Sequence, residues 1–207
     1  MKNIFANLYN ILLKHYGDPH WWPAKTPYEV IVGAILTQNT AWSNVERAIA
    51  SFGEELSPGR VLALSTDELA ELIRPAGFFN QKARYLKEVT AWLERRDPTS
   101  DTARVREELL SLKGVGRETA DSILLYAFGL PSFVVDAYTA RLLSRLNIDA
   151  GSNYEAVKAA FEENLPPDAE VYNRCHALIV VHSKERCRKK PICAGCPLTD
   201  MCVYDTI

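Results

Sequence analysis

Apolar residues recur at helical spacing along almost the whole chain, and the runs open with capping signals. In residues 26–38, Thr26 stands before Pro27 and Glu29, which is the pattern of an N-cap, a proline at the first helical position and a capping box. No segment alternates apolar and polar residues convincingly with a period of two. The sequence therefore predicts an all-α fold of roughly ten helices joined by short connections.

Further runs of the same kind follow along the chain. Ser65 and Glu68 form a second capping box, and Ser152 with Glu155 caps a later run at residues 153–165. A capping side chain accepts a hydrogen bond from an N–H group that the helix itself leaves unpaired. Each signal therefore predicts where a helix begins.

The composition limits the kind of partner that this chain can take. Of its 207 residues, 47% are apolar and 24% are charged, with a formal net charge of −2. Because no overall positive charge is present, a site for nucleic acid must be local. The amphipathic run at residues 1–17 has no small-residue cleavage site, and Pro131 breaks the longest apolar run. We therefore expect no contact with a membrane and a location inside the cell, in the cytoplasm with the nucleoid.

Two glycines, Gly114 and Gly116, interrupt sequence that favours helix on both sides. Residues 103–112 and 118–129 have helical periodicity, so "KGVG" between them forms a tight turn. Glycine accepts positive φ and lets another backbone approach closely. The free N–H groups at the start of the second helix then suit a phosphate. An ordinary helix–helix turn with a glycine C-cap explains the same residues, so both interpretations stay open here.

The surrounding residues resemble a known motif. Residues 112–146, "LKGVGRETADSILLYAFGLPSFVVDAYTARLLSRL", resemble the helix-hairpin-helix and the following acidic segment of base-excision DNA glycosylases related to endonuclease III. Lys113 stands where that family usually has proline. The resemblance covers nearly the whole chain, from Trp21 to Cys202.

The resemblance implies an architecture and a partner. It implies two helical domains with the active-site cleft between them: residues 1–24 with 131–207, which carry a metal loop, and a six-helix domain at residues 25–130. The expected partner is double-stranded DNA containing damaged bases, bound by a monomer. The hairpin is expected to grip DNA phosphates and to hold a monovalent cation through its carbonyls. Its DNA-binding residues are Lys113, Gly114, Val115, Gly116 and Arg117.

Asp136 is the catalytic carboxylate that the resemblance implies. An aspartate directly before an apolar run is also a preferred N-cap, and both roles can hold together because a helix N-terminus favours an ionised carboxylate. Breaking an N-glycosidic bond builds positive charge on the sugar, which a fixed carboxylate stabilises. Family members that also cut the backbone carry a lysine at the position of Glu118. We therefore predict an N-glycosylase, a hydrolase without AP lyase activity.

The predicted base pocket comes from two short stretches, "HWWP" and "LTQNTAW". Aromatic residues in a helical protein usually belong to the core. Together with "RPAGFFNQKA" at residues 74–83, however, these stretches resemble the 3-methyladenine glycosylases of endonuclease III type, in which two aromatic rings sandwich the flipped base. The matching residues are Trp21 and Trp42, with Trp22 and Gln38 as further pocket residues. Asn39 matches a DNA-binding residue of the family, although capping of a helix end would also explain it.

Four cysteines near the C-terminus predict a metal site. They are Cys187, Cys193, Cys196 and Cys202, spaced C-x5-C-x2-C-x5-C. Zinc and a [4Fe–4S] cluster both accept four thiolate ligands. The family pattern, C-x6-C-x2-C-x5-C around a [4Fe–4S] cluster, has a first loop one residue longer. The resemblance favours the cluster, with zinc as the alternative.

Basic residues surround the first of these cysteines. Arg188, Lys189 and Lys190 would bind backbone phosphate if a metal loop held them, although a solvated charge run explains them equally. Cys175 lies on an apolar helix and is predicted to be buried in the core.

The sequence and its resemblance together favour one function. It is a monofunctional DNA glycosylase of base excision repair that removes alkylated purines, 3-methyladenine first. The first alternative is an endonuclease III-type glycosylase for oxidised or deaminated bases, with AP lyase activity. The second is a non-catalytic module that binds damaged DNA.

Overall fold

The computed structural model describes residues 3–97 and 101–204, and within them it contains eleven α-helices and no strand. The all-α prediction is confirmed. The helices are α1 Ile4–Tyr16, α2 Pro27–Leu36, α3 Trp42–Ala50, α4 Pro58–Ala63, α5 Thr66–Leu72, α6 Phe79–Arg95, α7 Thr102–Ser111, α8 Arg117–Ser122, α9 Ala137–Arg145, α10 Tyr154–Asn164 and α11 Ala169–Glu185. Two short 3-10 turns, η1 Arg74–Ala76 and η3 Thr199–Met201, and a π-helical turn, η2 Ile123–Ala127, complete the set.

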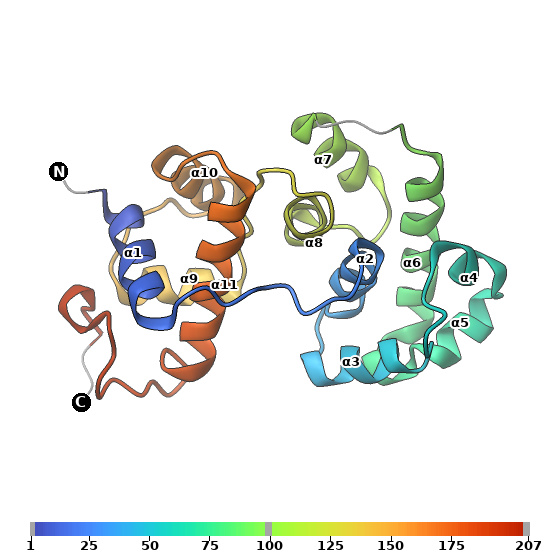
Figure 1. Cartoon of the computed structure of the whole chain (residues 1–207), viewed down its shortest axis with the longest axis horizontal. Coiled ribbons are helices and arrows are strands. Elements are labelled where there is room, and N and C mark those ends of the chain that lie inside the picture. Colours follow the sequence, from blue (N-terminus) through green and yellow to red (C-terminus); the bar gives the residue numbers. More distant parts are fainter. Residues whose placement is uncertain (1–2, 98–100, 205–207) are drawn as a thin grey trace. The chain divides into compact units, whose positions relative to one another are not determined.

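The chain divides into two compact units (Figure 1). The terminal unit consists of Met1–Pro23 together with Pro131–Ile207, and the middle unit of Ala24–Leu130. Residues 1–2 and 205–207 of the predicted terminal domain lie outside the described residues. Among the described residues, no helix is long and apolar enough to cross a membrane.

The middle unit is built around α2. This helix is apolar on every side, and eight of its residues are buried: Tyr28, Val30, Ile31, Val32, Gly33, Ala34, Ile35 and Leu36. A helix that is apolar all round must be covered on all faces, and α3, α6, α8 and η2 pack against it. Burial of each large aliphatic side chain contributes about 1.5–3 kcal/mol. The end of α2 is therefore held firmly where the predicted pocket residues begin.

The terminal unit is built around α11. Its buried face includes two histidines, His176 and His182, beside apolar residues. Figure 1 shows α1 and α9 lying against it, and both helices contact α11. Because α1 and α11 come from opposite ends of the chain, this unit forms only when the two ends meet.

The helix starts agree with the capping signals to within one residue. Ser65 and Glu68 form the complete capping box that the sequence predicts. At α2, Thr26 caps the amide of Glu29, but the Glu29 carboxylate accepts from Lys25 N at 3.1 Å rather than from the N-cap amide.

The cap of α10 differs from the prediction by one position. Asn153, not Ser152, has the extended backbone of an N-cap, and its side chain accepts from Ala156 N at 3.0 Å. Asparagine and serine cap about equally well. The turn before the helix, where Gly151 has a φ of +89°, therefore decides which one is used.

Candidate active site and nucleic-acid interface

The turn between α7 and α8 is the first candidate DNA contact. Gly114 has a φ of +87°, and a Cβ added there would lie 2.2 Å from ring carbons of Tyr85. Gly116 has a φ of −89°, lies in open space and forms the N-cap of α8 without a side-chain hydrogen bond. Position 114 therefore requires glycine both for its positive φ and for the space that the Tyr85 ring occupies. Glycine at position 116 leaves the start of α8 without a side-chain cap.

The other hairpin residues divide into one that is buried and two that are exposed. Val115 is buried in the core of the middle unit, so it anchors the turn rather than offering its side chain to DNA. Lys113 and Arg117 are exposed. The backbone amide of Lys113 donates to Glu88 Oε1 at 3.0 Å. A phosphate bound to that amide would have to displace the Glu88 carboxylate.

A cavity of about 510 Å³ lies beside the hairpin, entirely within the middle unit. Its walls include Gln38, whose Nε2 donates to the Gly114 carbonyl at 2.9 Å and to Thr119 Oγ1 at 3.0 Å. Gln38 therefore ties the end of α2 to both sides of the hairpin turn. Its amide nitrogen is committed to the protein.

Asn39 and Phe78 also line this cavity. Asn39 has a φ of +54°, while the N-cap of the next helix is Ala41 with no side-chain hydrogen bond, so Asn39 does not cap α3. Phe78 is 69% exposed and has a φ of +46°. Sequence reasoning missed Phe78. The signal was the pair "FF", because Phe79 packs on the core and its neighbour cannot.

A buried lysine supports the same cavity. Lys82 is 2% exposed, and its Nζ donates to the carbonyls of Leu36 and Ala76, each at 2.8 Å. Burial lowers the pKa of this ammonium group. The two carbonyls belong to the last residues of α2 and η1, so Lys82 joins the segments that present Gln38 and Phe78. Sequence reasoning missed this residue as well, since one lysine on an amphipathic helix carries no signal.

Asp136 is the N-cap of α9 in the terminal unit. Its Oδ1 accepts from Thr139 N at 2.7 Å and from Thr139 Oγ1 at 3.0 Å. Its Oδ2 lies 3.4 Å from His176 Nε2 of α11. Burial by itself would raise the pKa of the Asp136 carboxyl, but the interactions with His176 and Thr139 outweigh it and the pKa is lowered. The structure therefore holds this residue as an anion.

The Asp136 side chain is 13% exposed and lines an open cavity of about 500 Å³ formed by residues of α9, α10 and the loop between them. All of these residues belong to the terminal unit. The volume lies in the range of ordinary small-ligand pockets. A buried anion thus borders a space of suitable size for a substrate group.

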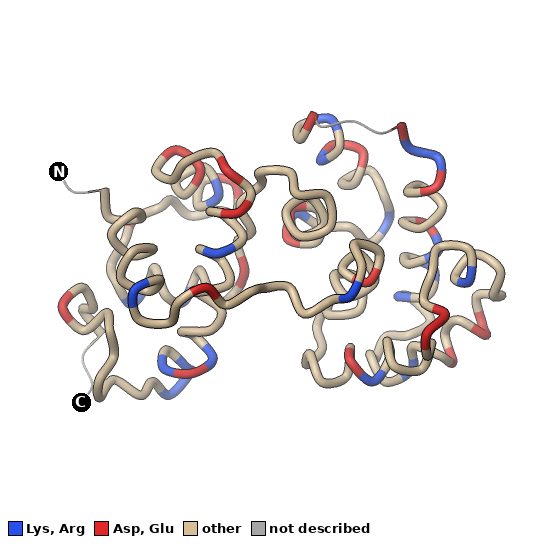
Figure 2. Tube along the Cα trace, viewed as in Figure 1, with Lys and Arg blue, Asp and Glu red and all other residues tan. Residues whose placement is uncertain are grey.

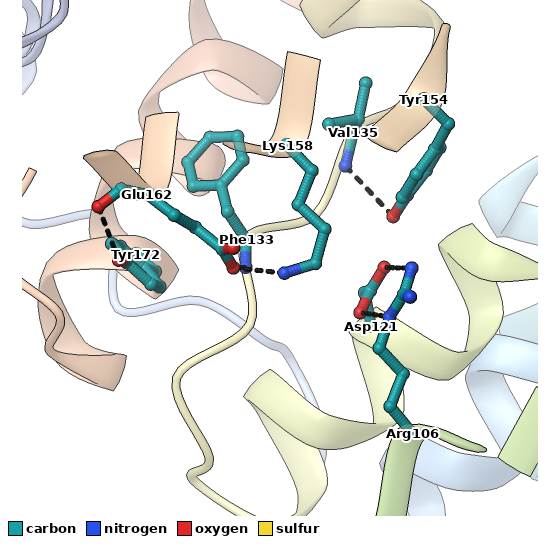
Figure 3. Close-up of polar contacts among 8 residues, drawn as sticks. All are labelled: Arg106, Asp121, Phe133, Val135, Tyr154, Lys158, Glu162 and Tyr172. Carbon is teal, nitrogen blue, oxygen red and sulfur yellow. Dashed lines mark hydrogen bonds and ion pairs between the residues drawn. The ribbon is translucent and has the colours of Figure 1, made fainter. Parts of the chain in front are cut away.

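The segment before Asp136 has no regular secondary structure, and side chains from α10 hold it (Figure 3). Phe133 N donates to Glu162 Oε1 at 2.8 Å, and Val135 N donates to the Tyr154 hydroxyl at 3.4 Å. The fully buried Phe133 ring stacks on Phe161, with centroids 4.0 Å apart. These contacts provide hydrogen-bond partners for buried amides that lie outside any helix. They also fix the conformation of the segment that leads to Asp136 at the start of α9.

Figure 3 also shows a buried ion pair on the hairpin helices of the middle unit. Arg106 of α7 binds Asp121 of α8 through two parallel contacts, Nε–Oδ1 at 2.8 Å and Nη2–Oδ2 at 3.0 Å. The Asp121 side chain is fully buried and that of Arg106 is 20% exposed. This bidentate pair links the two helices on either side of the glycine turn.

The three tryptophans predicted for the base pocket are each half-buried. Trp21 and Trp22 lie in the terminal unit with ring centroids 6.2 Å apart, and Lys184 Nζ lies 5.2 Å from the Trp21 ring centroid. Trp42 opens α3 in the middle unit, packs against its core and donates to Glu46 Oε1 at 3.0 Å. Packing against the core therefore accounts for the buried part of the Trp42 side chain. The stacking role of Trp21 and Trp42 stays a prediction.

The four predicted metal ligands line one small pocket of the terminal unit. Burial raises the pKa of the Cys196 thiol, and the charges of the other three cysteines raise it further. Arg145 Nη1 donates to Cys187 Sγ at 3.1 Å. Within residues 3–97 and 101–204, no group of three or more His, Cys, Asp or Glu is arranged to hold a metal ion. Four thiols around one pocket nonetheless match the donor set of a four-thiolate site.

The basic segment after Cys187 is exposed, and its backbone is fixed. Figure 2 shows Lys and Arg gathering at the end of α11. Arg145 donates to the carbonyls of Arg188 and Lys189 at 2.7 and 3.1 Å. The side chains of Arg188, Lys189 and Lys190 are exposed. Cys175, in contrast, is fully buried on α11, as the sequence predicts.

Comparisons with known proteins identify the family. A sequence model described as HhH-GPD superfamily base excision DNA repair protein matches residues 32–167. A relative in Methanocaldococcus jannaschii, named as a DNA repair glycosylase, is 53% identical over 207 residues, which cover 95% of this chain and 94% of the relative.

Solved structures agree with this match. Endonuclease III in a non-covalent complex with DNA has a TM-score of 0.83 at 25% identity, covering 98% of this chain and 95% of the other. The H. pylori 3-methyladenine DNA glycosylase bound to 1,N6-ethenoadenine has a TM-score of 0.74 at 30% identity, covering 88% of this chain and 96% of the other. Since the family model matches more than half of the chain, the protein belongs to the HhH-GPD superfamily of base excision repair proteins and is a DNA glycosylase of that family.

Proposed function

We propose that this protein is a monofunctional DNA glycosylase that flips alkylated purines, 3-methyladenine first, out of double-stranded DNA and hydrolyses their N-glycosidic bond. One observation carries the proposal. Asp136 is a carboxylate with a lowered pKa, held at the N-terminus of α9 beside an open cavity of about 500 Å³. A fixed anion at such a site suits a reaction that develops positive charge.

The chemistry needs little beyond this anion. The bond between C1′ of the sugar and the base nitrogen breaks, and its electron pair leaves with the base. Positive charge then develops on the sugar, where Asp136 stabilises it. A water oxygen adds to C1′ and releases its proton to the solvent. A base that already carries a positive charge leaves readily, and it is attracted to the faces of aromatic rings such as those of Trp21 and Trp42.

Glu118 supports the monofunctional part of the proposal. It lies exposed in the first turn of α8, where an acidic residue suits the helix dipole. A carboxylate cannot form the Schiff base through which a lysine cleaves the backbone. The reaction would then stop at an intact strand with an abasic site.

The middle unit would bind the DNA backbone. We assign the phosphate contacts to the hairpin turn, residues 113–117: to the backbone amides at the start of α8, which begins without a side-chain cap, and to the Lys113 amide once a phosphate displaces Glu88. A monovalent cation on the hairpin carbonyls belongs to the same proposal. Phe78, exposed beside the hairpin, is suited to enter the gap that a flipped base leaves, as apolar wedges do in other DNA-bending proteins.

The cysteine loop would hold a [4Fe–4S] cluster, or zinc as the alternative, through Cys187, Cys193, Cys196 and Cys202. Such a group cross-links the loop when it is bound. The chain's own part is to present Lys189, Lys190 and their neighbours to phosphates on a fixed backbone, which Arg145 already pins.

A second candidate is an endonuclease III-type enzyme for oxidised or deaminated bases with AP lyase activity. The observation that favours it is the TM-score of 0.83 to an endonuclease III complex, against 0.74 to the 3-methyladenine enzyme. Lys113, exposed in the turn close to Glu118, would have to supply the amine.

A base-release assay on defined duplexes tests the proposal. The duplexes carry methylated purines, hypoxanthine, uracil or an oxidised pyrimidine, and the released base is measured for the wild type and for Asp136→Asn. We expect release of methylated purines, strand breaks only after alkali, and a loss of at least about 100-fold in Asp136→Asn. Strand breaks without alkali, together with borohydride trapping that Lys113→Gln removes, would support the second candidate. Binding of damaged duplexes without release of any base would support the alternative that the protein is a non-catalytic DNA-binding module.

A further inference from the structure

Asp136 has more partners than an N-cap needs. The cap is complete with Oδ1, which accepts both the amide and the hydroxyl of Thr139. Oδ2 faces a second helix, where His176 Nε2 lies 3.4 Å away. The cap does not explain this contact, because His176 lies on α11 and plays no part in starting α9.

The histidine is held in place by the core of the terminal unit. It is 5% exposed, and the Phe133 ring stands edge-on to it, with centroids 6.4 Å apart and an angle of 89° between the planes. Phe133 also belongs to the segment that leads to Asp136. The ring of His176 therefore cannot turn away from Oδ2 without disturbing its packing against Phe133.

The hydrogen-bond acceptor sites of the Asp136 carboxylate are largely occupied by its neighbours. A carboxylate has about four lone-pair sites. Thr139 occupies two of them on Oδ1, and His176 faces Oδ2. A carboxylate engaged in this way stays ionised, so it has no proton to donate to a departing base, while its negative charge still acts on the cavity that it lines.

We propose that His176 is a positioning residue that holds Asp136 as a fixed anion, which stabilises positive charge but has no proton to give to a departing base, and that this restricts the enzyme to bases that leave without general-acid assistance. This inference rests on the function proposed above and deepens it. The substrate class is purines made cationic by alkylation. Neutral lesions such as hypoxanthine and uracil, which leave as anions unless an acid supplies a proton, are expected to be poor substrates.

Two matched substitutions separate positioning from packing. The amide nitrogen of glutamine falls close to the position of Nε2 of histidine, whereas that of asparagine falls close to Nδ1. His176→Gln therefore keeps a donor toward Oδ2, and His176→Asn keeps a polar side chain without that donor. Cys175→Ala, a change at a fully buried neighbour on the same helix, serves as the control for altered packing of α11.

The rate of release of methylated purines in a single turnover is measured between about pH 5 and about pH 8. The groups that act on the Asp136 carboxyl are His176 and Thr139. We expect flat profiles for the wild type, His176→Gln and Cys175→Ala. For His176→Asn we expect a rate about tenfold lower that falls further toward low pH, because the carboxyl without its partner takes up a proton at higher pH. Hypoxanthine and uracil should be released at least about 100-fold more slowly than methylated purines by the wild type.

A second measurement keeps the inference separate from the proposed activity. Carbon-13 NMR titration of the Asp136 carboxyl should show that it protonates at higher pH in His176→Asn than in the wild type and His176→Gln. Identical titrations, or identical pH–rate profiles, would overturn the positioning role even if the wild type is an active glycosylase. Equal release of neutral and cationic bases would overturn the restriction on substrates. If NMR shows the shift but no duplex loses a base, the proposed function is wrong and the positioning of the carboxylate stands.

Discussion

Single residues at the hairpin turn have separable physical roles. Gly114 combines a φ of +87° with a side that faces the Tyr85 ring, so a side chain there meets both backbone strain and a steric clash. Gly116 meets neither. In the sequence the two glycines look alike, and the conformation of the turn distinguishes them.

Gly114→Ala should therefore lower the free energy of unfolding by about 2–5 kcal/mol, the sum of left-handed strain and overpacking. Gly116→Ala, the matched control, should change it by less than about 1 kcal/mol. Urea denaturation followed by circular dichroism measures both. Adding Tyr85→Ala to Gly114→Ala should recover the part due to the clash, and a double variant no more stable than Gly114→Ala would contradict that assignment.

At the scale of elements, the hairpin helices α7 and α8 are joined by an ion pair rather than by apolar contact alone. Removing one partner of a buried pair leaves the other as an uncompensated charge, and that cost exceeds the value of the pair itself. Asp121 is fully buried, so its carboxylate would lose its bidentate partner inside the protein.

Arg106→Met should destabilise the protein by about 3–5 kcal/mol and weaken binding to an abasic duplex, because the turn loses the constraint between its two helices. Arg104→Met is the control: Arg104 also pairs with a glutamate, Glu108, but its side chain is 57% exposed. An exposed helical pair contributes about 0.3–0.5 kcal/mol. Equal effects of the two substitutions, measured by thermal unfolding and fluorescence anisotropy, would show that burial of Asp121 does not matter.

At the scale of the whole molecule, a net charge of −2 must coexist with DNA binding. Electrostatic affinity then depends on a few exposed basic residues rather than on a general positive field. The basic segment after Cys187 is the candidate whose backbone the structure holds in place.

Replacing Lys189 and Lys190 by glutamine should make the plot of log K against log salt less steep, by roughly 0.9 for each DNA phosphate that the variant no longer neutralises. The effect should be the same for damaged and undamaged duplexes, because binding to phosphates carries no base information. The control replaces Arg84 and Arg95, two exposed residues of α6, in the same way. If both double variants change the slope equally, the segment is only a solvated charge run.

The sequence by itself determined the helical class, most helix starts and the family, because periodicity, caps and the hairpin motif are local patterns. The capping box at Ser65 and the buried Cys175 follow from a few neighbouring residues. The N-cap of α10 was wrong by one residue, since adjacent Ser152 and Asn153 can both cap and only the turn chooses between them.

Only the tertiary structure decided which side chains act together. Lys82 reaches the end of α2, and His176 reaches Asp136, across 46 and 40 positions of sequence respectively. No local pattern marks either residue, because a lysine or a histidine on a helix is ordinary until another helix packs against it. Packing also exposed Phe78 while it covered its neighbour Phe79. The chemical character of individual site residues could thus be predicted from the sequence. The geometry of the candidate site could not, because it depends on contacts between distant segments, which the spacing of residues along the chain does not encode.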